Sequence, residues 1–219
     1  MKVASIGALA LLSSAAFATP VWYNGDDDEQ GAYYAVQGVN GTNEEFIQYE
    51  NFTWNSSENA GSIMGTMIAS NLFSQVNWEI REGMNASTGD MGTLVASGTA
   101  NANLIDLGDW MNTGVVDLYT MTADISPVVL SNGGDYFLGM AVVSTSPTFV
   151  AALTTTSGAN GVGSPVCDHV SSYVEVGLGL SATTHDVSMG IGTANPVPEP
   201  ASFAALGLGA LVLLRRRKN

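Results

Sequence analysis

Apolar and polar residues alternate along short segments in the middle of this chain, and the alternation predicts β-strands. The clearest segment is residues 76–81, VNWEIR, in which Val76, Trp78 and Ile80 are separated by polar residues. Successive side chains of a strand point to opposite faces of its sheet. The segment is therefore predicted to be a strand with one buried face and one solvated face.

Several further segments have the composition of strands and are bounded by glycine, serine, threonine or asparagine. They are residues 61–70, 92–99, 148–157 and 173–182. Turn residues recur about every 8–12 positions, a spacing typical of sandwiches and barrels. Before the C-terminal segment no stretch shows the 3.6-residue apolar period of an amphipathic helix. The pattern predicts an all-β fold, a jelly-roll-like antiparallel β-sandwich, over residues 19–195.

Residues 127–144 carry the pattern of a hairpin. A strand at 128–130 is followed by the turn residues Asn132, Gly133 and Gly134, and a second apolar segment covers 136–143. Turn residues between two apolar runs favour a hairpin. The second run is apolar at both odd and even positions, which predicts a central strand buried on both faces.

The first 18 residues have the pattern of a secretory signal peptide. Lys2 precedes an apolar run over residues 3–12, and Ala16 and Ala18 provide the small residues that a signal peptidase requires. The pattern predicts export through the Sec machinery and cleavage after Ala18.

The other end of the chain combines prolines, an apolar run and a cluster of cations. Residues 201–214 are uncharged, and four basic residues, 215–218, follow directly. As a helix, the run would be roughly 21 Å long at about 1.5 Å per residue. That is less than the roughly 20 residues that usually span a bilayer. The cations are expected to stay on the cytoplasmic side. The segment predicts a short transmembrane helix that holds the exported body transiently at the inner membrane.

This C-terminal segment resembles the PEP-CTERM sorting signal of bacterial exported proteins. Pro198, Glu199 and Pro200 match its tripeptide, and the apolar run and Arg215, Arg216 and Arg217 follow in the same order. The resemblance covers residues 196–219. It implies a Gram-negative bacterium and processing near the tripeptide by an exosortase, which delivers the body to the cell surface or the extracellular matrix. It also implies an association with exopolysaccharide and biofilm.

The exported body is strongly acidic. Of twenty acidic residues only Glu199 lies in the sorting segment, whereas of six basic residues only Arg81 lies in the body. Nineteen acids against one base give the body a net charge of −18 with histidines neutral. Such a surface repels nucleic acids and anionic lipids, so neither is an expected partner.

The sequence lacks the common catalytic motifs. We find no G-x-S-x-G, H-E-x-x-H, paired metal-ligand cysteines or phosphate loop. Cys167, Asp168 and His169 are adjacent, but neighbouring strand residues point to opposite faces, so a chance arrangement is favoured over a catalytic pair. Cys167 is the single cysteine, which excludes an internal disulfide. The body is predicted not to be an enzyme and to have no cofactor, with a structural calcium ion as the one candidate considered.

The acidic run that follows the signal peptide is the best candidate segment for a calcium site. Asn24, Asp26 and Asp28 alternate as oxygen donors, the ligand type that calcium prefers. Counted as an EF-hand loop from Asn24, positions six and twelve are Glu29 and Ala35, where glycine and glutamate are required, so this is not an EF-hand. A solvated charge run with no bound ion is the favoured interpretation, and a structural calcium ion at these residues is the alternative.

Together these features predict an exported surface or matrix protein with a structural role. One alternative is a secreted polysaccharide-binding module, which would expose at least two of its four tryptophans on one face. Another is a secreted hydrolase, which would place two carboxylates facing each other in a cleft.

Overall fold

The structure is a computed structural model that describes residues 20–38, 46–144, 146, 148–169, 172–175 and 179–194. Residues 18–195 form one compact unit. The signal peptide, with Ala16 and Ala18, and the sorting segment 196–219 lie outside the described residues, so their predicted elements are not assessed. Within the described residues, no helix is long and apolar enough to cross a bilayer.

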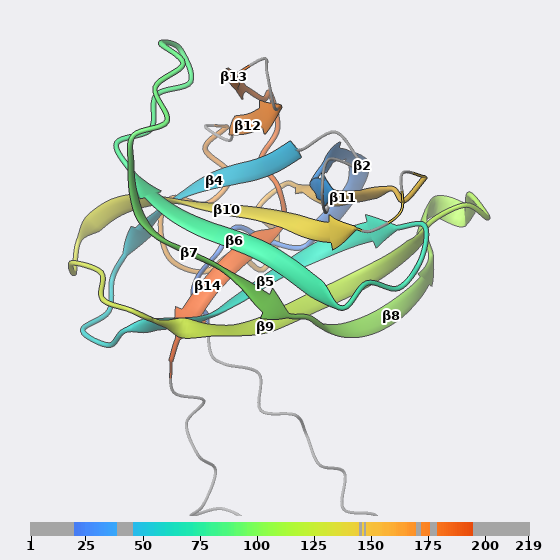
Figure 1. Cartoon of the computed structure of the whole chain (residues 1–219), viewed down its shortest axis with the longest axis horizontal. Helices are drawn as coiled ribbons and strands as arrows, with labels where there is room; N and C mark the ends of the chain where they lie inside the picture. The colour runs from blue at the N-terminus through green and yellow to red at the C-terminus, as the bar shows by residue number, and fades with distance from the viewer. Residues whose placement is uncertain are drawn as a thin grey trace, which may run out of the picture. The chain divides into compact units, whose positions relative to one another are not determined.

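The described chain folds into two β-sheets, each with seven strands in this part of the chain (Figure 1). The first sheet consists of β1 (Pro20–Tyr23), β2 (Asp27–Tyr34), β5 (Ala60–Ala69), β8 (Asn103–Asp109), β9 (Asp117–Val128), β11 (Ala151–Thr156) and β14 (Met189–Thr193). The second consists of β3 (Val36–Gly38), β4 (Phe46–Trp54), β6 (Gln75–Glu82), β7 (Thr93–Asn101), β10 (Gly134–Ser144), β12 (Ser172–Glu175) and β13 (Gly179–Ala182). One 3-10 turn, η2 (Trp110–Asn112), lies between β8 and β9.

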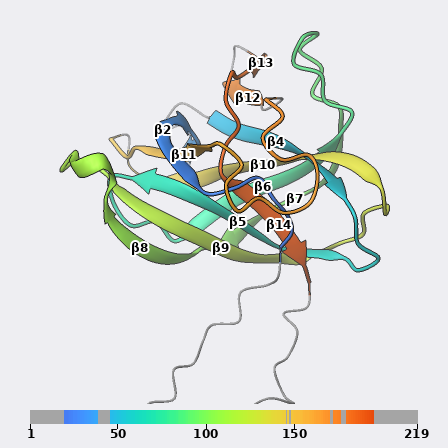
Figure 2. The same cartoon turned by 180° about the vertical axis from the view of Figure 1, so that it is seen from behind.

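The strand pairings are antiparallel in both sheets, apart from the parallel pair of β3 with β10. In the first sheet β5 is central: β9 pairs along one side of it, and β14 and β11 share the other side. In the second sheet β10 is central, between β4 and β6. Figures 1 and 2 show the two sheets as facing layers. The predicted all-β fold with antiparallel sheets is therefore confirmed.

A single large apolar cluster fills the space between the two sheets. The Trp22 ring of β1 lies 5.5 Å from the Phe52 ring of β4, and Phe52 lies 5.7 Å from the Tyr136 ring of β10. Trp22 and Phe52 are almost completely buried. Burial of large side chains from both sheets is the main favourable contribution to folding, so this cluster holds the two sheets together.

Several of the predicted strands are present. Residues 76–81 lie in β6 with Val76, Trp78 and Ile80 buried, as the alternation predicts. Segments 61–70 and 92–99 overlap most of β5 and β7, and segment 148–157 contains β11, whereas segment 173–182 divides into β12 and β13.

The predicted hairpin over residues 127–144 is wrong. Of its first predicted strand, 128–130, only Val128 belongs to a strand, β9, whereas its second segment, 136–143, lies within β10. Val128 ends β9 opposite Ala60 in the first sheet, and Gly134 starts β10 opposite Trp54 in the second sheet. The turn residues therefore form an arch between the sheets instead of a tight connection within one sheet. The prediction of a central strand for this segment is confirmed by the position of β10.

Candidate metal centre

Glu50 is a carboxylate on the inner face of β4. It lies opposite Leu138 of β10, and both it and Leu138 are buried, with Glu50 1% exposed. Residues directly opposite each other in a sheet point to the same face, and every second residue of a strand shares that face. Glu50 therefore occupies the same row as Phe52 and Trp54 of the apolar cluster.

Asp186 is a second carboxylate, from the segment that leads into β14 of the first sheet. It is 0% exposed. Its position is set by the backbone of β11: the Thr156 amide donates to the Asp186 carbonyl at 3.0 Å, and Thr155 forms a bridge with Val187. The segment thus holds the Asp186 side chain next to a buried part of the fold.

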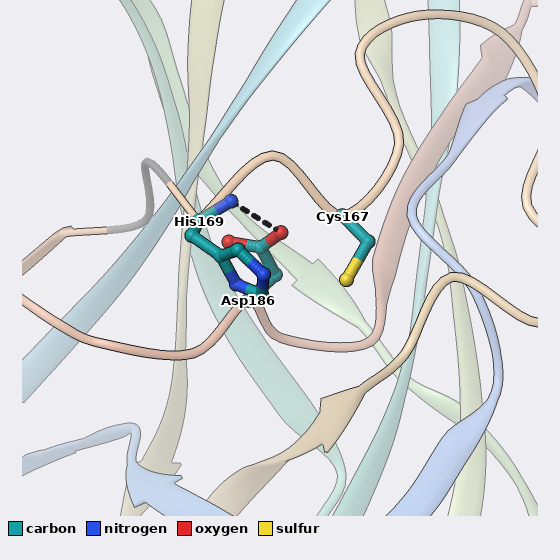
Figure 3. A group of neighbouring side chains, drawn as sticks. All are labelled: Cys167, His169 and Asp186. Atoms are coloured by element: carbon teal, nitrogen blue, oxygen red, sulfur yellow. Dashed lines mark hydrogen bonds between the residues drawn. The ribbon is translucent and has the colours of Figure 1, made fainter.

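Each of these two carboxylates has one oxygen bound by a backbone amide and one oxygen without a partner. Glu50 Oε2 accepts from the Val187 amide at 2.9 Å, and Asp186 Oδ2 accepts from the His169 amide at 2.9 Å (Figure 3). Glu50 Oε1 and Asp186 Oδ1 are buried and make no hydrogen bond. Buried polar atoms without partners are rare in proteins and need an explanation.

The loop between β11 and β12 brings further ligand atoms to the same place. Cys167 and His169 have positive φ angles of 50° and 61°, an uncommon conformation for residues other than glycine. Hydrogen bonds support it: the Cys167 amide donates to Asn24 Oδ1 at 2.8 Å, and Asn51 Nδ2 donates to Asp168 Oδ2 at 2.9 Å. The loop thereby presents Asp168 beside the two buried carboxylates.

Two overlapping sets of side chains in the described chain have ligand atoms close enough to share one ion. One set is Glu50, Asp168 and Asp186, and the other is Cys167, His169 and Asp186; within each set all ligand atoms lie within 4.8 Å of one another. The first set offers only oxygen, which suits calcium or magnesium. The second offers sulfur, nitrogen and oxygen, which suits zinc.

The surroundings of this cluster disfavour negative charge. Burial raises the pKa of Glu50 well above its ordinary value, and the charges of Asp186 and Asp168 raise it further. Burial, followed by the charge of Asp186, also raises the pKa of the Cys167 thiol. Arg81, the only basic residue in the described part of the chain, is paired with Glu79 at 2.9 Å and does not neutralise the cluster.

The structure places the three predicted calcium ligands elsewhere and gives them other partners. Asn24 is buried, and its amide nitrogen donates to the Val187 carbonyl at 3.3 Å while its oxygen binds the Cys167 amide. Asp26 accepts from Tyr23 Oη at 2.9 Å and from Asn160 Nδ2 at 2.6 Å. Asp28 Oδ1 accepts from the Gln30 amide at 3.0 Å and from Thr155 Oγ1 at 2.6 Å.

A calcium site at Asn24, Asp26 and Asp28 therefore stays a prediction, and the carboxylates that do come together are different ones. Sequence reasoning missed Glu50 and Asp186. The sequence does contain a signal for Glu50. It is a charged residue at a position where alternation predicts an apolar one, because Phe52 and Trp54 follow at alternate positions. Asp186 has no comparable signal, since it lies in a short irregular segment.

Comparison with known proteins gives a single finding. The family model for the PEP-CTERM protein-sorting motif matches residues 196–218. The match includes Pro198, Glu199 and Pro200 and the basic residues 215–218. No curated protein and no solved structure matches the chain. The chain therefore carries a PEP-CTERM protein-sorting motif at its C-terminal end, which indicates an exported protein that is targeted to an exosortase.

Proposed function

We propose that the protein is a structural component of the cell surface or extracellular matrix of a Gram-negative bacterium, delivered there by exosortase processing at Pro198-Glu199-Pro200. The observation that carries this proposal is the match of residues 196–218 to the sorting motif. The short apolar run at 201–214 suits a temporary anchor, because it is shorter than a usual membrane span. An association with exopolysaccharide and biofilm is part of the same proposal and follows from the kind of motif.

A role other than catalysis is supported by the state of the reactive groups. Glu50 and Asp186 are two carboxylates of one cluster, but each is at most 1% exposed, so a polymeric substrate has no access to them. The raised pKa of the Cys167 thiol keeps it protonated and weakly nucleophilic. These features favour a structural body over a hydrolase.

The tryptophans give no support to the alternative of a polysaccharide-binding module. Trp22, Trp54 and Trp78 are buried in the core. Trp110 is half-buried, and its indole nitrogen donates to Asp27 at 3.2 Å. All four tryptophans lie in the described part of the chain, and there they do not form the platform of two exposed indoles that this alternative requires.

We also infer that the body has jelly-roll topology. A jelly roll has two four-stranded sheets built from two Greek keys. The strand orders β2-β11-β5-β9 in one sheet and β4-β10-β6-β7 in the other support this assignment. Of the remaining strands, β14 pairs with the central β5 and β3 pairs with the central β10, whereas β1, β8, β12 and β13 extend the two sheets further.

The proposed delivery is tested by the intact mass of the protein recovered from the outer surface and medium of its host. The expected mass corresponds to a chain that begins at Thr19 and ends near Pro198. Glu199→Ala is expected to leave a longer chain in the membrane fraction, whereas Glu58→Ala, an exposed residue of the body, should be processed normally. Normal release of the Glu199→Ala variant would contradict the proposal.

The matrix role is tested separately in a host strain that lacks the protein. We expect this strain to retain less polysaccharide in its matrix, and expression of the wild-type chain should restore it. Unchanged matrix content would remove the exopolysaccharide part of the proposal and leave the delivery part intact.

A further inference from the structure

We propose that Glu50, Asp168 and Asp186 bind a calcium ion between the two sheets, at a site different from the acidic run near the N-terminus. The ligand atoms of these three residues lie within 4.8 Å of one another. They come from three separate segments: β4, the loop before β12, and the segment before β14. The proposal does not depend on how the protein is delivered.

Charge balance is the first reason for a cation at this position. Glu50 and Asp186 are both completely buried and close together. Two buried like charges are strongly unfavourable unless a proton or a cation compensates them. Arg81, the one arginine or lysine of the described chain, is bound to Glu79, so no arginine or lysine among the described residues supplies such a cation.

The two free carboxylate oxygens are the second reason. The backbone amides of Val187 and His169 hold one oxygen of each carboxylate and thereby orient the other. These other oxygens, Glu50 Oε1 and Asp186 Oδ1, are buried without any hydrogen-bond partner. Calcium–oxygen distances of about 2.3–2.6 Å allow one ion to bridge oxygens up to about 5 Å apart. The spacing within the cluster fits this limit.

The donor set favours calcium over zinc and magnesium. All three side chains offer oxygen, and calcium accepts several carboxylates in irregular geometry. Magnesium prefers a regular octahedron and retains several waters, which a closed position between two sheets does not suit. Zinc would use the alternative set of Cys167, His169 and Asp186, but the Cys167 thiol already donates to the Thr156 carbonyl at 3.5 Å.

The ion would act as a clamp between the two sheets. Glu50 belongs to the second sheet, and Asp186 is held by β11 of the first sheet. Asp168 is the exposed member of the set and provides the route by which an ion enters. The bound ion would fix the loop over the space between the sheets and raise the stability of the exported body, since a ligand that binds only the folded state stabilises it.

The test is calcium titration of the protein purified from its host and stripped with a chelator. We expect one calcium ion per chain with a dissociation constant of about 10⁻⁴ to 10⁻³ M, the range of extracellular calcium modules. Thermal unfolding should shift upward in calcium and less in magnesium. Glu50→Gln and Asp186→Asn should each weaken calcium binding at least about tenfold, because affinity depends on the number of charged ligands.

Matched controls separate this site from other acidic positions. Asp124→Asn replaces an exposed carboxylate of β9 and should leave calcium binding unchanged. Asp168→Asn keeps the core intact and should also weaken binding, which tests the site even if a buried variant fails to fold. Loss of binding in Asp28→Asn with retention in Asp168→Asn would overturn the proposal in favour of the N-terminal acidic run.

Two further outcomes would also overturn the proposal. The first is a wild-type protein that binds no calcium, which means that a proton balances the charge of the cluster. The second is tight zinc binding that is lost in Cys167→Ser and unaffected in Glu50→Gln, which assigns the metal to the other set of ligands.

Discussion

The carboxylates of Glu50 and Asp186 meet between the two sheets, with ligand atoms within 4.8 Å of each other and both side chains buried. Glu50 receives a hydrogen bond from Val187, the residue that follows Asp186, so the two segments are also joined through the backbone. A pair of like charges in the interior makes this part of the fold sensitive to pH and to cations.

The metal-free protein is expected to lose stability as the pH rises. The folded-state pKa of Glu50 is raised above its unfolded value, so the folded protein holds a proton that the unfolded chain releases. The stabilisation is complete below the unfolded pKa of about 4.3 and is lost as the pH rises through the folded pKa. The slope for one proton is at most about 1.4 kcal/mol per pH unit. This slope is measured by urea unfolding at several pH values in the presence of a chelator.

The acidic groups that face Glu50 are Asp186 from the segment before β14 and Asp168 from the loop before β12, and their charges raise the pKa of Glu50 further. Glu50→Gln cannot ionise and is expected to flatten the profile. An equally steep fall of stability in this variant would show that Glu50 is not the group responsible.

Cys167 is expected to react slowly with alkylating agents in the folded protein. Burial and the nearby charge of Asp186 raise the pKa of its thiol, so little of the reactive thiolate is present near neutral pH. Mass spectrometry after timed exposure to iodoacetamide should show slower modification of the folded chain than of the same chain in urea. Equal rates in the two conditions would indicate an accessible and unperturbed thiol.

Gly139→Ala is expected to destabilise the body by about 1–3 kcal/mol, the usual cost of extra volume in a well-packed region. A Cβ atom at this position of β10 would collide with the Tyr49 ring of β4. Gly31→Ala on β2 is the control, because its Cβ would lie 3.7 Å from Thr155 in ordinary contact. The free energies of unfolding of the two variants are compared by denaturant titration. Equal values would mean that the Tyr49 ring can move aside.

Trp22→Ala is expected to cost about 3–5 kcal/mol, the range for removal of a buried tryptophan side chain. Trp22 is fully buried, its ring packs against Phe52, and its indole nitrogen donates to the Pro165 carbonyl at 2.6 Å. Trp110→Ala should cost clearly less, because Trp110 lies half-buried in η2 outside the main cluster. The free energies of unfolding from urea titrations provide the comparison, and similar losses for the two variants would contradict it.

Asn24 has a structural role that its sequence pattern did not predict. Its alternation with Asp26 and Asp28 predicted a calcium ligand, yet its side chain binds the backbone of Cys167 and Val187. It therefore supports the loop that presents Asp168. The chemistry of an isolated acidic run does not reveal such a role, because the partners are more than 140 positions away.

The sequence by itself determined the features that are read locally along the chain. The sorting motif at 196–218 depends on the order of a tripeptide, an apolar run and a basic cluster, which needs no tertiary contact to be recognised. The strand at residues 76–81 follows from alternation, because the two faces of a strand meet different surroundings wherever it is placed.

Only the tertiary structure decided which distant segments meet. Alternation assigns a side chain to a face of its strand but does not say what lies across from that face, so β9 and β10 looked like a hairpin and instead belong to opposite sheets. For the same reason the sequence could identify Glu50 as a charged residue in an otherwise apolar row. It could not show that Asp186 lies next to it. Their proximity depends on how two sheets pack and how one loop closes over them, and these contacts form between residues far apart in sequence.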